Sequence, residues 1–164
     1  MPDELRLSAG PFDGPTVFAD RLREAFAAAA DRAWPALWCA DARFADWPLG
    51  EAAVIQALQA WAGSARRLRL VMRDDRLLRE RHPRFVAWRQ RWDHIIECRI
   101  CADRDAADLP SGLWTPGWTV ERHDPVLSRG SSSGAQAAVE SLRHRMDDAF
   151  ARGRPGFPAS ILGL

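Results

Sequence analysis

Residues 66–101 read RRLRLVMRDDRLLRERHPRFVAWRQRWDHIIECRIC, and this segment sets the fold class. It begins with a strand pattern, Arg66–Arg73, in which arginine and apolar residues alternate before the run becomes continuously apolar. A helical pattern follows, is interrupted at Pro83, and gives way to another strand pattern at His94–Cys101. Strands that alternate with helices predict a sheet of parallel strands covered by helices.

The rest of the chain extends this pattern on both sides and predicts one α/β domain over residues 1–164. Its sheet is expected to be mixed but mostly parallel, with helices on both faces and an antiparallel edge where the later strands follow closely. Residues 1–14 are expected to be a loose lead-in, and the apolar tail 155–164 is expected to pack back on the domain. The remaining predicted elements are a helix over 15–33, a strand over 35–40, a helix from Glu51 to a stop at Gly63, strands near Leu113–Trp114 and Trp118–His123, a flexible loop over Arg129–Gly134 and a helix over Ala135–Arg152.

The charge of the chain is balanced overall but uneven along its length. The formal net charge is +1, whereas residues 64–104 carry 12 arginines and 6 acidic residues. Lysine is absent, so every basic residue is arginine. Mechanisms that need a lysine nucleophile, a Schiff base or a phosphate-holding lysine are therefore excluded.

Composition also indicates a compartment. Apolar residues make up 47% of the chain, but no run approaches the ~18 apolar residues of a membrane-spanning helix. Residues 1–4 carry no basic group ahead of an apolar run, so no signal peptide is expected. Three cysteines without a disulfide-like framework fit a reducing interior. We therefore expect a bacterial, cytoplasmic protein with no membrane partner.

The motif Cys98-Arg-Ile-Cys101 has the spacing of a metal or redox pair. In a strand, side chains three positions apart point to opposite faces, so we interpret both cysteines as buried structural residues. The four histidines form no metal-binding pattern, and no glycine-rich phosphate loop occurs. No metal and no cofactor are therefore predicted.

Arginines and tryptophans interleave in the segment 81–92. Such a surface can stack nucleobases, but Trp88 and Trp92 also share a helical stripe with Phe85, and we favour a core role for that stripe. Arg84 and Arg91 lie seven residues apart and would share one helix face, which makes them the strongest candidate pair for binding an anion.

Residues 116–133 suggest a family. The order of strands and helices, followed by a strand pair and the Gly-Ser segment Gly130–Ser133, resembles one half of the phospholipase D-like superfamily, and the chain is similar to uncharacterised bacterial proteins with that fold. The family's histidine nucleophile would fall on Pro116, its lysine on Trp118 and its aspartate on His123. Because the nucleophile and lysine are missing, the resemblance implies a non-catalytic domain. Since active members combine two halves, it also implies a homodimer.

We therefore carry three functional hypotheses. The first is a non-catalytic phospholipase D-like module that binds an unidentified protein or a small anionic ligand. The second is a phosphodiesterase or nuclease in which His82 or His123 is nucleophile or acid, assisted by Ser131. The third is nucleic-acid binding through the basic segment 64–104.

The candidate anion-binding residues come from two places in the chain. They are Arg84 and Arg91 in the basic segment, together with Gly130, Ser131 and Ser133 in the Gly-Ser segment. Arginine can replace lysine as a phosphate ligand because its guanidinium group forms two parallel hydrogen bonds.

Overall fold

A computed structural model of the chain describes residues 6–102 and 109–159. The helices are α1 (Pro15–Ala28), α2 (Ala52–Trp61), α3 (Arg76–Arg81), α4 (Pro83–Arg91) and α5 (Gln136–Arg152). The strands are β1 (Gly10–Asp13), β2 (Ala36–Ala40), β3 (Arg67–Met72), β4 (Ile96–Ile100), β5 (Ser111–Trp114), β6 (Thr119–Asp124), β7 (Arg129–Ser133) and β8 (Arg154–Pro155). Short 3-10 helices, η1 (Pro48–Gly50) and η2 (Asp93–Ile95), precede α2 and β4.

Within the described residues the strands form one eight-stranded sheet in the order β1-β7-β6-β5-β2-β3-β4-β8. The pairs β2–β3 and β3–β4 are parallel, and all other neighbours are antiparallel. The α/β class and the mixed sheet are confirmed, but the prediction of a mostly parallel sheet is wrong. Strands β5, β6 and β7 follow one another through short turns, which favour antiparallel pairing, and β1 and β8 extend both edges in the same manner.

Three of these strands, β1, β7 and β8, lie where no strand was expected. β1 lies inside the segment predicted as a loose lead-in, and β7 replaces the predicted flexible loop over Arg129–Gly134. Both sides of β7 are paired, one with β1 and the other with β6. The Gly-Ser segment is therefore a central strand of this part of the sheet.

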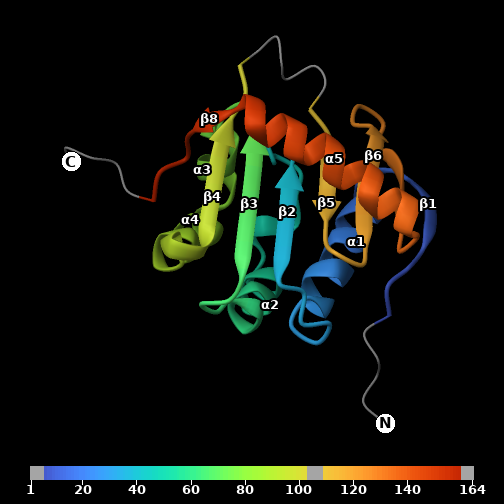
Figure 1. Cartoon of the computed structure of the whole chain (residues 1–164), viewed down its shortest axis with the longest axis horizontal. Helices are drawn as coiled ribbons and strands as arrows, with labels where there is room; N and C mark the ends of the chain where they lie inside the picture. Colours follow the sequence, from blue (N-terminus) through green and yellow to red (C-terminus); the bar gives the residue numbers. More distant parts are fainter. Residues whose placement is uncertain (1–5, 103–108, 160–164) are drawn as a thin grey trace.

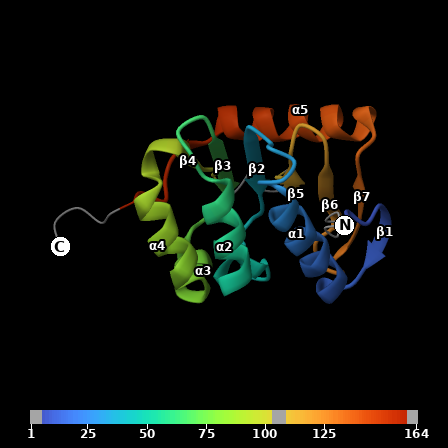
Figure 2. The same cartoon turned by 90° about the horizontal axis from the view of Figure 1, so that it is seen from below.

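Helices cover both faces of the sheet, as predicted (Figure 2). Among the helices of the described residues, α5 lies on one face, and α1, α2, α3 and α4 lie on the other. In β3, Leu68, Leu70 and Met72 belong to the core beneath the four helices, whereas Val71 belongs to the core beneath α5. Side chains alternate between the two faces of β3, as the sequence indicated, so the strand contributes to both cores.

The cysteines follow the same rule. Cys98 lies in the core beneath the four helices, and Cys101 lies in the core beneath α5. The prediction that they point to opposite faces is confirmed, and both thiols are buried. Burial is the main cause that raises the pKa of Cys98 to about 11, so its thiol is protonated at neutral pH.

The described part of the tail packs on the domain. β8 pairs with the end of β4, and the Phe157 ring is buried 6.4 Å from the ring of Phe85 on α4. Arg89 Nε donates a hydrogen bond to the Phe157 carbonyl oxygen over 3.1 Å. Residues 1–5 of the lead-in and residues 160–164 of the tail lie outside the described residues.

Candidate functional site

A groove runs between α2 and α4 and has a volume of about 630 Å³. We call it the α2–α4 groove. Its lining consists of Ala52, Ile55, Gln56, Gln59, Ala60, Arg84, Ala87, Trp88 and Arg91. Both members of the predicted arginine pair therefore lie on one concave surface.

The local sequence explains how α4 presents these arginines. Pro83 occupies the first turn of the helix, where a missing N–H costs no hydrogen bond. Phe85 and Trp88 are buried in the core, so the core interpretation of this stripe is confirmed. Arg84 and Arg91 lie on the exposed part of the same helix. Seven residues span about 10.5 Å along a helix axis, so the two side chains start two turns apart.

The polar groups of the groove include hydrogen-bond donors without local acceptors. Arg84 Nη1 donates to the Gly50 carbonyl oxygen over 2.9 Å, and its other N–H groups are unused among the described residues. The Arg91 side chain makes no hydrogen bond or ion pair within residues 6–102 and 109–159. Gln59 Oε1 accepts a hydrogen bond from Trp92 Nε1 over 3.0 Å, which leaves the Gln59 amide hydrogens available. No carboxylate of the described residues lines the groove.

The neighbouring helix α3 adds two exposed arginines without an acidic partner in the described part of the chain, Arg76 and Arg81. Arg81 donates to a backbone carbonyl, that of Ala45, over 3.5 Å. We call this set of four exposed arginines on α3 and α4, Arg76, Arg81, Arg84 and Arg91, the basic surface. Arg79 and Arg89 do not contribute to it, because Asp75 and Asp93 neutralise them.

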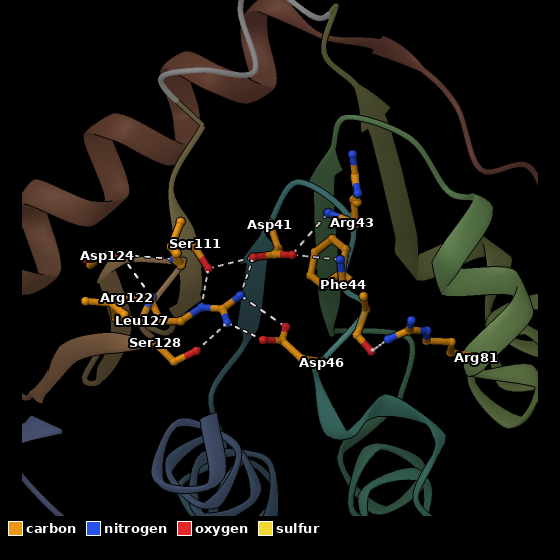
Figure 3. Close-up of polar contacts among 12 residues, drawn as sticks. Asp41, Arg43, Phe44, Asp46, Arg81, Ser111, Arg122, Asp124, Leu127 and Ser128 are labelled. Atoms are coloured by element: carbon orange, nitrogen blue, oxygen red, sulfur yellow. Dashed lines mark hydrogen bonds and ion pairs between the residues drawn. The ribbon is translucent and has the colours of Figure 1, made fainter. Parts of the chain in front are cut away.

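A second polar cluster, which sequence reasoning missed, lies where β2 ends (Figure 3). Arg122 on β6 is 5% exposed and donates hydrogen bonds to Asp41, Asp46, Ser111 and Ser128. Its contact with Asp41 is 2.8 Å long. The signal in the sequence was Asp41 itself, a carboxylate placed directly after a predicted buried strand, but its partner lies 81 residues away.

This cluster holds a strained loop in place. Phe44 has a φ of 56°, a conformation unusual for a bulky residue, and its ring is fully buried. Asp41 Oδ2 accepts hydrogen bonds from the backbone N–H groups of Arg43 and Phe44. Each oxygen of Asp41 is thus engaged within the fold, so we interpret the cluster as structural.

His82 lies buried between α3 and α4. Its Nε2 is 2.7 Å from the Phe44 carbonyl oxygen, which makes that nitrogen the donor in the neutral ring. Burial is the largest influence on the pKa of His82 and lowers it, and the charge of Arg81 lowers it further. The hydrogen bond with Phe44 and the charge of Asp46 raise the pKa, but the net shift is downward. The structure thus gives His82 a positioning contact with the loop after β2.

His123 and Ser131 do lie together, on adjacent strands β6 and β7. His123 Nε2 is 3.4 Å from Ser131 Oγ, and His123 Nδ1 is 4.0 Å from Glu121 Oε1. The Glu121 carboxylate is already paired with Arg145 of α5. The catalytic role given to His123 and Ser131 stays a prediction.

The five candidate anion-binding residues do not form one site. The two arginines lie on α4. Gly130, Ser131 and Ser133 lie on β7, which is separated from β3 by three strands of the sheet, β6, β5 and β2. Gly130 serves the close approach of β6, because a Cβ atom there would lie 1.8 Å from the Glu121 carbonyl oxygen. Ser133 Oγ accepts a hydrogen bond from the N–H of Ala135, at the start of α5.

Metal and membrane features were searched within the described residues. In residues 6–102 and 109–159, no three histidine, cysteine or acidic side chains gather as metal ligands. Over the same ranges, no helix has the length and apolar character required to cross a bilayer.

Comparison with known proteins adds a structural likeness. No protein-family model matches the chain, and no curated protein matches it. The chain is similar to the solved structure of TrmBL2, described as an archaeal chromatin protein with a novel mode of DNA binding. The TM-score is 0.67 at 11% sequence identity, which shows a shared fold. The match covers 95% of this chain and 57% of the TrmBL2 chain.

This likeness corrects the family expectation. The resemblance to the phospholipase D-like superfamily is wrong: the fold matches a chromatin protein, and the supposed Gly-Ser turn is strand β7. The hypothesis of a non-catalytic phospholipase D-like module is withdrawn with it. The homodimer was expected because active members of that superfamily combine two halves, so that argument for a homodimer no longer applies.

Proposed function

We propose that this protein binds nucleic acid through the basic surface of α3 and α4. The observation that carries the proposal is a set of four exposed arginines, Arg76, Arg81, Arg84 and Arg91, with no acidic partner among the described residues. A phosphate backbone supplies the anions that such a surface lacks. Release of counterions from that backbone then favours binding.

The distribution of charge supports this choice. Residues 76–92 contain six arginines and a single glutamate, although the whole chain has a net charge of only +1. Helix α2, which forms the opposite wall of the groove, carries no charged residue. The positive potential of α3 and α4 is therefore not cancelled by the helix beside them.

The chemistry of arginine supports it further. A guanidinium group offers five N–H donors in a planar fork and binds phosphate oxygens in pairs. The structural likeness to TrmBL2, whose description includes DNA binding, points to the same class of ligand. Because this chain spans 57% of TrmBL2, the residues are assigned from this chain's own surface.

The test is fluorescence anisotropy with a labelled oligonucleotide across a salt series. Replacing Arg84→Gln together with Arg91→Gln should weaken binding about tenfold at low salt. In a plot of log K against log salt concentration, the negative slope should become less steep by about 1.8 if the double variant neutralises two fewer phosphates of a duplex. The matched control is Arg32→Gln with Arg143→Gln, which removes the same charge from two exposed positions elsewhere.

Two outcomes would contradict the proposal. One is an absence of binding at about 50 mM salt, where phosphate contacts are strongest. The other is an equal loss of affinity in both double variants, which would assign the effect to net charge instead of to the groove.

A further inference from the structure

We infer that the α2–α4 groove accepts an unpaired nucleobase, so that single-stranded nucleic acid is the form this protein binds most tightly. The inference rests on the proposed function and specifies its ligand. It concerns what the groove contains beyond its arginines.

The floor of the groove is apolar, which phosphate binding alone does not require. Apart from Arg84, Arg91 and two glutamines, the lining consists of Ala87 and Trp88 on α4 and of Ile55 and two alanines on α2. Phosphate oxygens gain nothing from such a surface, whereas the flat face of a base gains from leaving water there. A volume of about 630 Å³ lies in the range of sites for small organic groups.

The walls of the groove add the hydrogen-bonding groups that a base edge needs. The Gln56 side chain forms no hydrogen bond with the described residues, and the Gln59 side chain uses only its oxygen, on Trp92. An amide carries both donors and an acceptor, which match the mixed edges of nucleobases. The indole N–H of Trp88, which also lines the groove, is buried without an acceptor in the described chain.

The two arginines fix how a strand would run. The two arginines start about 10.5 Å apart along the helix axis. One of them can therefore hold the phosphate before a base that occupies the groove, and the other can hold the phosphate after it. A duplex conceals its base faces by stacking and pairing, so it can offer the groove only its phosphates. A single strand offers both the phosphates and the face of a base.

The experiment compares three oligonucleotides of equal length by anisotropy. They are a single strand, the duplex that contains it, and a single strand with abasic sites in place of its bases, which keeps every phosphate. We expect the single strand to bind at least tenfold more tightly than the abasic strand and more tightly than the duplex.

A groove-filling variant then locates the effect. Ala87→Phe places a ring in the groove at an exposed helix position, and it should reduce single-strand affinity to the level of the abasic strand. The matched control is Ala137→Phe, at an exposed position of α5. Circular dichroism melts confirm that both variants are folded.

The outcomes separate the two proposals. If the three oligonucleotides bind alike and with strong salt dependence, the proposed function stands and the base-binding groove is overturned. If the Ala137→Phe control loses the preference equally, the groove is likewise overturned. If none binds at low salt, both proposals fail.

Discussion

Arg122 is a buried cation that donates hydrogen bonds to four side chains of the described residues. Its removal leaves Asp41, whose side chain is 8% exposed, as a buried charge without its cation. We expect Arg122→Leu to lower the free energy of unfolding by about 3–5 kcal/mol, the usual cost of breaking a buried pair on one side. Urea denaturation followed by circular dichroism measures this.

The matched control for Arg122 is Arg129, which pairs with Asp13 at the surface. Their side chains are 59% and 68% exposed, so Arg129→Leu should cost less than about 1 kcal/mol. A similar loss in both variants would show that the Arg122 cluster does not hold the loop after β2.

His82 makes stability depend on pH. Burial lowers its pKa in the folded protein below the ordinary value of 6.5, so the unfolded chain binds the proton more readily. Stability contributed by the neutral ring is therefore complete above about pH 6.5 and decreases as the pH falls toward the lowered pKa. Urea midpoints at about pH 7.5 and pH 5.5 should differ, with the lower midpoint in acid.

A substitution isolates that effect. His82→Gln keeps an N–H donor for the Phe44 carbonyl but does not titrate, so its midpoint should change less between the two pH values. His144→Gln, at an exposed position of α5, should retain the full dependence of the wild type. An unchanged pH dependence in His82→Gln would contradict the assignment.

At the scale of elements, the pairing of β6 with β7 depends on Gly130. An added Cβ would lie 1.8 Å from the Glu121 carbonyl oxygen and 2.8 Å from Arg122 Cα, both backbone atoms that cannot move independently. We expect Gly130→Ala to lower the free energy of unfolding by about 3 kcal/mol, the upper end for overpacking. Thermal or urea unfolding measures the change.

Gly63 provides the comparison for Gly130. A Cβ there meets no atom within 4 Å, so Gly63→Ala should be neutral or stabilise by up to about 1 kcal/mol through the unfolded chain. If Gly130→Ala were equally neutral, β6 and β7 would not approach as closely as described.

The same strands show where prediction from sequence ends. β3 and β4 were predicted because apolar side chains on their faces leave a pattern. β7 was missed because its serines and glycine have the composition of a loop, and backbone pairing on both sides makes it a strand. β1 was missed for a similar reason, since Phe12 is its only buried residue. When the pairs made by β1, β7 and β8 are included, most neighbouring strands of the sheet are antiparallel.

The candidate site likewise has a part that the sequence predicted and a part that it did not. The spacing of Arg84 and Arg91 within one helix predicted their shared face, and the groove confirms that they lie together. Gln56 and Gln59 were missed because the packing of α2 against α4 joins residues far apart in the chain. The Arg122 cluster was missed because its contacts with Asp41 and Asp46 span 81 and 76 residues.

At the scale of the whole molecule, the sheet joins a parallel part, β2 to β4, to an antiparallel part, β5 to β7 with β1. The two parts meet where β2 pairs with β5, and there the rings of Trp38 and Trp114 lie 4.4 Å apart. Helix α5 contacts β3, β5 and β6 and therefore bridges the junction (Figure 1). The Arg122–Asp41 pair also bridges it, because it joins β6 to the end of β2.

Because the junction carries strand pairing, a helix and an ion pair, we expect residues 1–164 to unfold as one domain. Urea curves from far-ultraviolet circular dichroism and from tryptophan fluorescence should coincide, with a single transition in each. Arg122→Leu should move both curves to lower urea together, because the pair it breaks joins the two parts. Two separated transitions, or a variant that moves only one probe, would mean that the parallel and antiparallel parts unfold independently, and the single-domain prediction would then be wrong.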